Sequence, residues 1–359
     1  MTGPSAGSAR GLADSFRRLI ANTGPISLAQ FMGEANARYY AGKNPLGAAG
    51  DFVTAPEISQ MFGELIGLWL ADLWTRAGYP APVQYVELGP GRGSLAADAL
   101  RAMQRHGLEP RVHLVEGSPA LRALQRSAVP QAQFHDDLAQ VPPDGSLLLV
   151  ANEFLDALPV HQLVMTESGW REIMVSIDEA GRFVPVPGDR PIDAAVPMDR
   201  RAADIGTVIE ICAAAAAIVA EAAQRLAQQG GAALFIDYGH AAPRAGSTLQ
   251  AVRAHRMVDP FDDPGAADLT THVDFATLAT VGVSRGARWL GTVSQGSWLR
   301  ALGIEARADV LATAAPQHAG SLMRAKDRLA GDEQMGLLFK VMGLAGPEWP
   351  DAAGFPARA

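Results

Sequence analysis

A glycine-rich stretch at residues 86–94 is the strongest candidate for a ligand-binding site in this sequence. It reads Val-Glu-Leu-Gly-Pro-Gly-Arg-Gly-Ser and follows a short apolar run, where a strand would turn into a helix. Glycines at such a turn adopt positive φ angles and let a ligand approach the backbone. The N-terminus of the following helix offers N–H groups to a carboxylate or a phosphate. The motif therefore predicts a binding loop for a nucleotide-type ligand.

Two nucleotide-type cofactors use a turn of this kind. A dinucleotide site requires Gly-x-Gly-x-x-Gly, which would need a glycine where this chain has Ser94. The pattern Glu-x-Gly-x-Gly-x-Gly, formed by Glu87, Gly89, Gly91 and Gly93, is the usual loop of methyltransferases that use S-adenosylmethionine (SAM). There the acid and the glycines hold the methionine end of SAM. The loop alone is weak support, because a glycine-rich turn is often only structural.

Acids at the ends of the next two strands suit the nucleoside end of such a cofactor. Glu116 follows the glycines by about 20 residues, where a ribose diol can donate two hydrogen bonds to a carboxylate. Asp136 and Asp137 then lie at the depth where an adenine would sit. The structural alternatives are a solvated acid at a strand end for Glu116, and a polar turn that caps a helix for the two aspartates.

The fourth apolar run ends in Asn-Glu-Phe-Leu-Asp-Ala-Leu-Pro at residues 152–159, which supplies the candidate catalytic groups Asn152, Glu153 and Asp156. Polar groups directly after an apolar strand are costly unless they are paired or used. Methyl transfer is an in-line displacement, so the protein mainly has to orient the nucleophile. Two carboxylates can grip a protonated guanidinium through its fork of N–H groups. The alternative interpretation is that Glu153 and Asp156 are acids at a helix N-terminus, where the helix dipole favours negative charge.

Few other residues indicate chemistry. The fifth apolar run ends in Phe-Ile-Asp-Tyr-Gly-His, and we expect Asp237 and Tyr238 to line the substrate site. The eight histidines show no metal-ligand spacing, and neither Gly-x-Ser-x-Gly nor a Walker loop occurs. The single cysteine, Cys212, can form neither an internal disulfide nor a thiolate cluster. No metal site is therefore expected.

Short apolar runs alternate with helical segments from residue 83 on, which predicts an α/β fold with a parallel sheet covered on both faces. Ligands of open α/β sheets bind at the carboxyl ends of the strands, where the candidate residues lie. A last run, Leu337–Met342, suits an edge strand that closes the sheet. The other strands are expected at 83–88, 112–115, 147–150 and 234–236, and the later helices at 213–228, near 273–279 and twice between 297 and 330.

The rest of the chain is expected to be helical or inserted. Thr54 and Glu57 have the spacing of a capping box, followed by apolar residues at helical intervals. A stretch with several prolines interrupts the alternation after residue 157, and 163–165 with 171–175 could form an antiparallel hairpin. The expected division is an N-terminal helical region at 1–80, a core at 81–156 and 205–345, an inserted substrate or partner segment at 157–204, and a C-terminal tail at 346–359.

Composition excludes several classes of function. The 359 residues are 48% hydrophobic and 19% charged, so the chain can bury a large core. A net charge of −8 argues against broad binding to nucleic acid or to an anionic bilayer. The longest apolar run, Ile211–Ala220, is shorter than the roughly 20 residues of a membrane span. Because the N-terminus lacks the pattern of a signal peptide, we expect a cytoplasmic protein.

Five blocks of the sequence together resemble the MidA family of SAM-dependent methyltransferases, which includes the mitochondrial complex I assembly factor. The resemblance runs in the same order from residue 10 to residue 343, and it is most specific in Thr-Ala-Pro-Glu-Ile-Ser-Gln and Asn-Glu-Phe-Leu-Asp-Ala-Leu-Pro. The blocks are residues 50–60, 86–93, 152–159, 236–240 and 336–341.

This resemblance implies a seven-stranded Rossmann-like methyltransferase sheet with an added N-terminal helical region and a segment inserted after the fourth strand. It also implies that SAM contacts the three glycines of the loop and Glu116, with Asp136 or Asp137 near the adenine. In the mitochondrial member the activity is symmetric dimethylation of an arginine on a core subunit of respiratory complex I. Carried to this chain, Glu153 and Asp156 would hold the arginine.

The block that begins at Gly50 would help to close the site through Thr54, Glu57 and Gln60. The family usually reads Tyr-Thr-Ser-Pro-Glu here, whereas this chain has Val53 and Ala55 at the first and third of these positions. The change removes two hydroxyl groups from the predicted site.

The resulting hypothesis is a SAM-dependent protein arginine N-methyltransferase. Its partner would be a protein that carries a target arginine, such as a complex I core subunit, and neither a nucleic acid nor a membrane span is expected. The location would be the cytoplasm of a bacterium or the mitochondrion of a eukaryote. Two alternatives are a methyltransferase for a small molecule or another nitrogen nucleophile, and an assembly chaperone that binds SAM or a partner without turnover.

Overall fold

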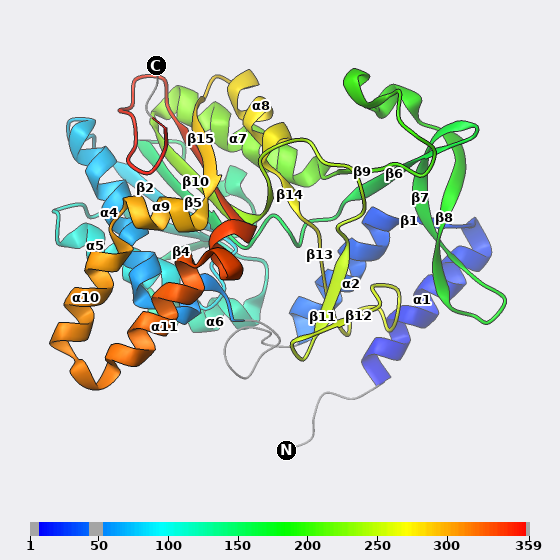
Figure 1. Cartoon of the computed structure of the whole chain (residues 1–359), viewed down its shortest axis with the longest axis horizontal. Coiled ribbons are helices and arrows are strands. Elements are labelled where there is room, and N and C mark those ends of the chain that lie inside the picture. The colour runs from blue at the N-terminus through cyan, green and yellow to red at the C-terminus, as the bar shows by residue number, and fades with distance from the viewer. Residues whose placement is uncertain (1–6, 43–52, 357–359) are drawn as a thin grey trace. The chain divides into compact units, whose positions relative to one another are not determined.

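The computed structural model describes residues 7–42 and 53–356, which divide between two compact units (Figure 1). The first unit comprises residues up to 45, 156–215 and 243–272, and the second comprises 46–155, 216–242 and the residues from 273 on.

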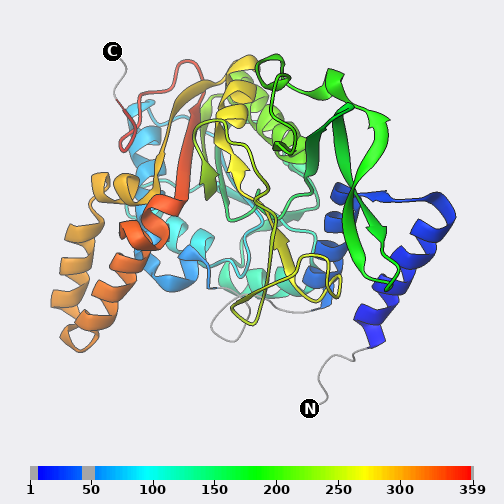
Figure 2. The same ribbon diagram turned by 45° about the vertical axis from the view of Figure 1, so that its right-hand side comes forward.

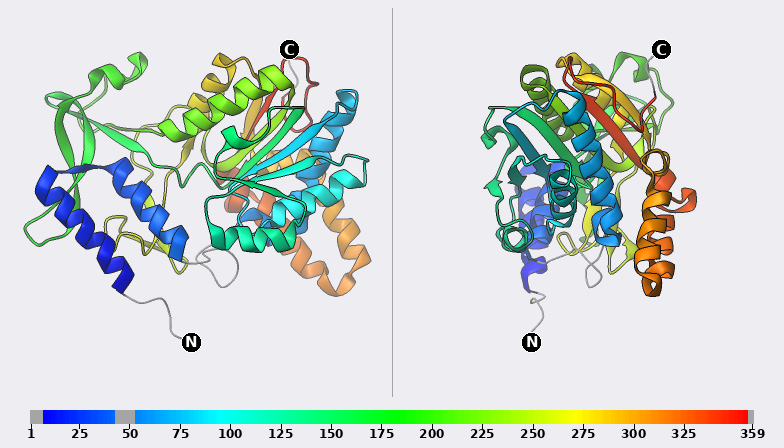
Figure 3. Two further views of the ribbon diagram at one scale, coloured as in Figure 1. Left: turned by 180° about the vertical axis from the view of Figure 1, so that it is seen from behind. Right: turned by 90° about the vertical axis from the view of Figure 1, so that its left-hand side faces the viewer.

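The second unit is built on a large, mostly parallel sheet, whose strands are seen from behind in Figure 3. From one edge to the other its strands are β15 (Arg288–Ser294), β16 (Phe339–Ala345), β10 (Gly231–His240), β5 (Ser146–Asn152), β2 (Val83–Leu88), β3 (Arg111–Val115) and β4 (Gln133–His135). Strand β16 is antiparallel to both of its neighbours, and the others pair in parallel. The two-residue β14 (Val273–Asp274) also pairs with β10.

The central strands agree with the sequence analysis. The range 83–88 coincides with β2, and the runs that begin at 112, 147 and 234 lie inside β3, β5 and β10. The edge position expected for Leu337–Met342 is wrong, because this strand starts at Phe339 and lies between β10 and β15. Val341, Met342 and Leu344 are all fully buried. A strand that is apolar on both faces suits the interior of a sheet rather than its edge.

The helices of this unit follow the expected alternation. They are α3 (Ala55–Ile58), α4 (Gln60–Arg76), α5 (Ser94–Gln104), α6 (Pro119–Ala128), most of α7 (Ala213–Gln229), α8 (Phe275–Ser284), α9 (Gln295–Ala301), α10 (Ile304–Ala314) and α11 (Ala319–Ala330). The expected helix at 213–228 is confirmed as α7. Helix α8 begins later than expected, because residues 273 and 274 pair with β10 instead. Where two helices were expected between 297 and 330 there are α9, α10 and α11, and the last two form a helical hairpin (Figure 2).

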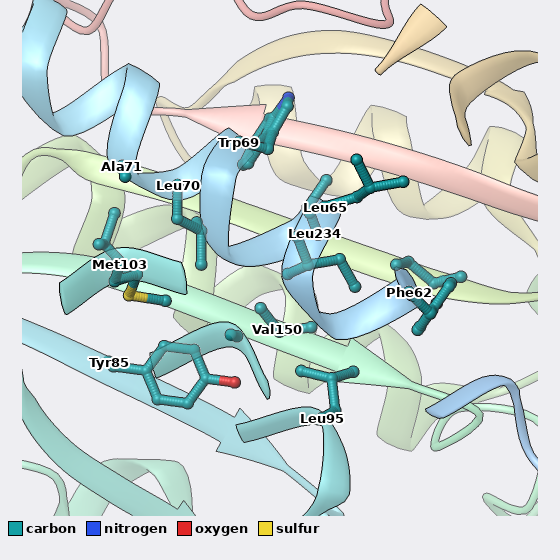
Figure 4. Close-up of a cluster of buried hydrophobic side chains, with 14 of the residues drawn as sticks. Phe62, Leu65, Trp69, Leu70, Ala71, Tyr85, Leu95, Met103, Val150 and Leu234 are labelled. Atoms are coloured by element: carbon teal, nitrogen blue, oxygen red, sulfur yellow. The ribbon is translucent and has the colours of Figure 1, made fainter. Parts of the chain in front are cut away.

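Helices α4 and α5 cover the face of the sheet that carries Tyr85, Val150 and Leu234 (Figure 4). The two helices approach each other closely at Gly67, where an added Cβ would lie 2.3 Å from the backbone oxygen of Ala99. A larger residue at this position would therefore separate the helices. The apolar residues of α4 are core residues, as its helical spacing predicts, and include Phe62, Leu65, Trp69 and Leu70.

The segment after Thr54 forms two helices rather than one. Ser59 has extended backbone angles (φ −164°, ψ 141°), and its side chain caps α4 by accepting a hydrogen bond from the N–H of Met61. Thr54 precedes α3 without a side-chain cap bond to the described residues. The carboxylate of Glu57 instead accepts a hydrogen bond from the hydroxyl of Ser94 at 2.5 Å. The expected capping box is therefore wrong, because α5 engages the glutamate that would complete it.

On the opposite face of the sheet, His113 is fully buried between neighbouring strands. Its Nδ1 lies 2.9 Å from Nε2 of His135, and its Nε2 lies 2.7 Å from Oε1 of Gln84. Burial first, and then the neighbouring His135 and Arg225, lower the pKa of His113 to about 4 from its ordinary 6.5. The folded protein therefore holds this imidazole neutral.

This pKa shift predicts a loss of stability in acid. Between pH 6.5 and about 4 the unfolded chain binds a proton at His113 that the folded protein does not, so the free energy of unfolding falls as the pH falls. The His113 contribution changes by about 1.4 kcal/mol per pH unit, or about 3 kcal/mol over this window. In urea denaturation, the gap in unfolding free energy between the wild type and His113→Gln should shrink by that amount. A gap that stays constant with pH would contradict the shift.

The first unit contains helices α1 (Gly7–Thr23) and α2 (Leu28–Gly42) with two antiparallel sheets. One sheet runs β1 (Ile26–Ser27), β7 (Gly169–Ile177), β6 (His161–Thr166) and β9 (Val208–Ile211), with β8 (Phe183–Pro191) also paired to β7. The other runs β12 (Arg256–Val258), β11 (Gln250–Arg253) and β13 (Asp268–Thr270). The predicted hairpin is confirmed as β6 and β7. Stacked rings of Phe16 and Phe31, 4.9 Å apart, lie at the core of this unit beside Phe183.

Some connections form short turns of helix. They are the 3-10 turns Leu138–Gln140, Asp193–Ala195, Met198–Arg200 and Pro316–His318, and the π turn Asp332–Gly336. Within residues 7–42 and 53–356, none of the helices combines the length and the apolar character of a membrane span. The same residues contain no group of three or more His, Cys, Asp or Glu side chains arranged to bind a metal ion.

Candidate functional site

The carboxyl ends of the parallel strands bring together most of the residues that the sequence singled out. Leu88 at the end of β2 lies level with Val115 on β3 and with Ala151 on β5. Asn152, the last residue of β5, lies level with Ile236 on β10. The glycine loop, the acid after β3 and the polar run after β5 therefore start at the same edge of the sheet.

The glycine loop has the backbone conformation that its sequence predicts. Gly89, Gly91 and Gly93 have φ angles of 61°, 54° and 84°, which favour glycine. A Cβ at Gly89 would lie 2.6 Å from the ring of Phe154, so the loop runs directly against the segment after β5. Helix α5 follows the loop at once, and the N–H groups of its first turn have no acceptor within the helix. The loop can therefore receive an anionic group at its backbone.

Glu116 is half-buried beside this loop and is held by specific contacts. Its carboxylate accepts hydrogen bonds from the N–H of Ser118 at 2.7 Å and from the side-chain amide of Gln125 at 3.2 Å. The same amide nitrogen donates to the backbone oxygen of Gly91 at 2.7 Å, so Gln125 joins the acid to the loop. Burial raises the pKa of Glu116, and the two donors partly offset that rise.

Gln125 is a residue that the sequence analysis missed. It is fully buried on α6, and no donor among the described residues reaches its Oε1 atom. A sequence signal was present, because Gln125 lies four residues after the buried Leu121 and thus interrupts the apolar stripe of an amphipathic helix.

Glu87 is buried in the core. It lies two residues after Tyr85 on the same face of β2, and its carboxylate accepts a hydrogen bond from the tyrosine hydroxyl at 2.7 Å. Burial raises the pKa of Glu87 to about 7. Its predicted contact with the methionine end of a cofactor stays a prediction.

Asp136 and Asp137 follow β4 with exposed side chains. Asp136 accepts a hydrogen bond from the guanidinium of Arg122 at 2.6 Å. Asp137 caps the turn that follows by accepting from the N–H of Ala139 at 3.0 Å. These contacts match those of a polar turn, and the predicted role near an adenine stays a prediction.

The residues directly after β5 form the most strained part of the site. Glu153 has a φ of +49°, a left-handed conformation that is uncommon for residues other than glycine. Its Oε1 accepts hydrogen bonds from the N–H of Ala55 at 2.8 Å and from the amide of Asn152 at 3.2 Å. Asn152 is 8% exposed, and no donor among the described residues reaches its Oδ1 atom. Strained residues of this kind cluster at active sites.

Strand β10 holds this segment in place. Asp237 is 1% exposed, and its Oδ2 accepts hydrogen bonds from the N–H groups of Phe154 at 3.1 Å and Leu155 at 3.0 Å. The ring of the next residue, Tyr238, lies edge-on to that of Phe339, with 5.5 Å between the ring centroids. The predicted substrate contacts of Asp237 and Tyr238 stay predictions.

The remaining predicted residues are divided between the units. Thr54, Glu57 and Gln60 belong to the second unit, where Gln60 donates to the carboxylate of Glu64 at 3.4 Å. Asp156 belongs to the first unit and is buried there. Burial of Tyr40 raises the pKa of its hydroxyl, and the nearby charges of Asp268 and Asp156 raise it further.

Comparison with known proteins identifies the family. Residues 65–293, more than half of the chain, match the model of a family of S-adenosyl-L-methionine-dependent methyltransferases. The chain belongs to this family. It is 38% identical over 357 residues to the mitochondrial protein arginine methyltransferase NDUFAF7 of Danio rerio, covering 89% of this chain and 83% of that protein. The NDUFAF7 of Homo sapiens is 36% identical over 365 residues, covering 90% and 81%.

A solved structure agrees with this family. The crystal structure of a protein from Burkholderia thailandensis bound to S-adenosyl-homocysteine is 31% identical in sequence, with a TM-score of 0.84. The match covers 99% of this chain and 97% of that one. The protein is therefore a SAM-dependent methyltransferase, and the large parallel sheet is its methyltransferase fold.

The residues at the strand ends of this methyltransferase fit SAM. The loop offers backbone N–H groups to a carboxylate, and Glu116 offers oxygen atoms to the two hydroxyls of a ribose. The buried Oε1 of Gln125, which lacks a donor among the described residues, adds a further acceptor beside them. Gly89, Gly91, Gly93 and Glu116 are therefore the residues that we expect to hold the cofactor.

Replacing Gln125 with leucine should weaken SAM binding. The change keeps a side chain of similar size in the core but replaces with methyl groups the amide that joins Gly91 to Glu116. We expect the Kd for SAM to rise about tenfold, since a hydrogen bond to a charged group is worth about 1.5–3 kcal/mol and tenfold is 1.4 kcal/mol. Isothermal titration calorimetry measures this Kd, and Gln104→Leu, at an exposed position, is the control. An unchanged Kd in Gln125→Leu would show that the bridge is only structural.

Proposed function

We propose that this methyltransferase transfers methyl groups to the guanidinium of an arginine in a protein substrate. The observation that carries the proposal is the pair of acceptors at the end of β5. The carboxylate of Glu153 and the Oδ1 of Asn152, a buried acceptor with no donor among the described residues, suit the N–H groups of a cation. The relatives named protein arginine methyltransferases support the same acceptor.

In this proposal the protein orients the nucleophile and handles its charge. When bound, SAM supplies an electrophilic methyl group on a sulfonium. Glu153 accepts N–H hydrogen bonds from the guanidinium, which concentrates the positive charge away from the nitrogen that attacks and aligns that nitrogen. The proton that the methylated nitrogen loses is received at the Glu153 carboxylate. Asp156 stays the predicted second carboxylate on the arginine, and the predicted roles of Thr54, Glu57 and Gln60 in closing the site are part of the proposal.

The more specific predictions about substrate, partner segment and location are part of this proposal as well. A core subunit of respiratory complex I is the first candidate substrate, on the strength of the family resemblance. Residues 157–204 are proposed to recognise the protein partner. A bacterial cytoplasm or a mitochondrion is the proposed location.

The experiment that tests the proposal is methyl transfer from radiolabelled SAM to purified complex I subunits, followed by amino-acid analysis. We expect the label in methylarginine, and its loss when the candidate arginines of the acceptor are replaced by lysine. Label in another residue or in a small molecule would reject arginine as the acceptor. Binding of SAM with no transfer to any fraction would favour the chaperone alternative.

A further inference from the structure

The carboxylate of Asp237 contacts the protein backbone at several points. Its Oδ2 accepts hydrogen bonds from the N–H groups of Phe154 and Leu155, and its Oδ1 accepts from the N–H of Tyr238 at 3.0 Å. Asp237 is 1% exposed, so this charge is almost completely removed from water. Hydrogen bonds from several N–H groups are what make a buried carboxylate tolerable.

Two of these N–H groups belong to the residues that directly follow Glu153. The N–H of Glu153 itself donates to the backbone oxygen of Ile236 at 2.9 Å. Three consecutive N–H groups, those of residues 153, 154 and 155, are therefore held by two consecutive residues of β10. This attachment keeps Glu153 at a φ of +49°, a conformation that a glutamate does not adopt readily.

The left-handed conformation determines where the Glu153 carboxylate lies. In this arrangement Oε1 accepts from the N–H of Ala55 and from the amide of Asn152. If the turn relaxed to an ordinary negative φ, the side chain would leave the end of β5 in a different direction. The position of the carboxylate thus depends on the attachment of the turn to β10.

We propose that Asp237 is a positioning residue that acts through Glu153, by holding the strained turn that aims the Glu153 carboxylate. This role differs from the direct substrate contact of Asp237 expected from the sequence, which stays a prediction. The proposal rests on the proposed function, because it assumes that Glu153 binds the acceptor. The geometric part, that Asp237 holds the turn, is independent of which acceptor is used.

The first measurement tests the geometric part in the full chain without any substrate. Amide hydrogen exchange at Phe154 and Leu155 is followed in the wild type and in Asp237→Asn, which keeps the shape of the side chain but loses its charge. We expect exchange at both amides to become about tenfold faster or more, as for a locally opened segment. Unchanged protection would overturn the proposal. Asp237→Ser, which keeps a single acceptor oxygen, is measured in parallel in case the asparagine variant does not fold.

The second measurement is a double-mutant cycle on methyl transfer. Asp237→Asn should lower kcat about 10- to 100-fold in the wild-type background, with the Kd for SAM unchanged. In the Glu153→Gln background, Asp237→Asn should lower kcat by less than about twofold. A residue that acts through Glu153 has no further effect once that carboxylate has been neutralised. Equal losses in the two backgrounds would overturn the proposal.

The matched control is Asp178→Asn. Asp178 accepts hydrogen bonds from the N–H groups of Ala180 and Arg182 in the turn between β7 and β8, and it belongs to the first unit. Its replacement should leave kcat and the exchange at residues 154 and 155 unchanged. If the wild type does not methylate arginine at all, the proposed function fails, and the exchange result still decides whether Asp237 holds the turn.

Discussion

Replacing Gly91 with valine is expected to abolish SAM binding while the fold is retained. Gly91 has a φ of +54°, and its backbone oxygen accepts the hydrogen bond from Gln125 that joins the loop to Glu116. A valine would place two methyl groups where the cofactor approaches the backbone, and its branched side chain is strained at this φ. We expect the Kd for SAM to rise about 100-fold or more, which corresponds to about 2.7 kcal/mol or more of lost binding free energy.

The control for this variant separates backbone strain from loss of the site. Gly107 has a φ of +77°, has no atoms within 4 Å of an added Cβ, and lies beyond the far end of α5. Gly107→Val should therefore show a similar strain of about 1–2 kcal/mol in thermal unfolding but an unchanged Kd in calorimetry. If Gly91→Val bound SAM with wild-type affinity, the loop would be structural and the cofactor assignment of its glycines would be wrong.

Neutralising Glu153 is expected to stop methyl transfer without affecting SAM binding. Glu153→Gln keeps the length of the side chain and an oxygen that can still accept from the N–H of Ala55. It removes the charge that, in the proposed function, orients and stabilises the guanidinium. Removal of a preorganised electrostatic contact typically lowers kcat by about 10²- to 10³-fold, or about 3–4 kcal/mol of activation free energy, and we expect a loss of this size.

The readouts for Glu153→Gln are kcat with an arginine-bearing acceptor and the Kd for SAM. The exposed Glu109→Gln, in the loop before β3, is the matched control and should keep both values. Full activity of Glu153→Gln would remove this residue from the mechanism. A loss of SAM binding in the same variant would instead assign Glu153 to the cofactor.

Much of the second unit could be predicted because its signals are local. The strand at 83–88 is mostly apolar and is buried along its whole length, and the loop after it needs glycines because its backbone adopts positive φ angles. The predictions that were wrong or missing have a common cause. In each case the local structure depends on a partner from a distant part of the chain. Glu57 does not complete a capping box because Ser94 engages its carboxylate. Leu337–Met342 does not form an edge strand because β15 pairs with β16 on its outer side.

The residues of the candidate site divide in the same way. The family, the cofactor loop and the polar run after β5 follow from residue types and their spacing, since these depend on the backbone conformation of a few neighbouring residues. The hydrogen bonds that Gln125 makes to Gly91 and Glu116, and those that Asp237 accepts from residues 154 and 155, could not be predicted in this way. Each depends on a side chain that lies 34 or more positions from one of its partners in the sequence. Such contacts exist only once strands and helices are packed together, because packing removes these polar groups from water and makes each of them find a partner.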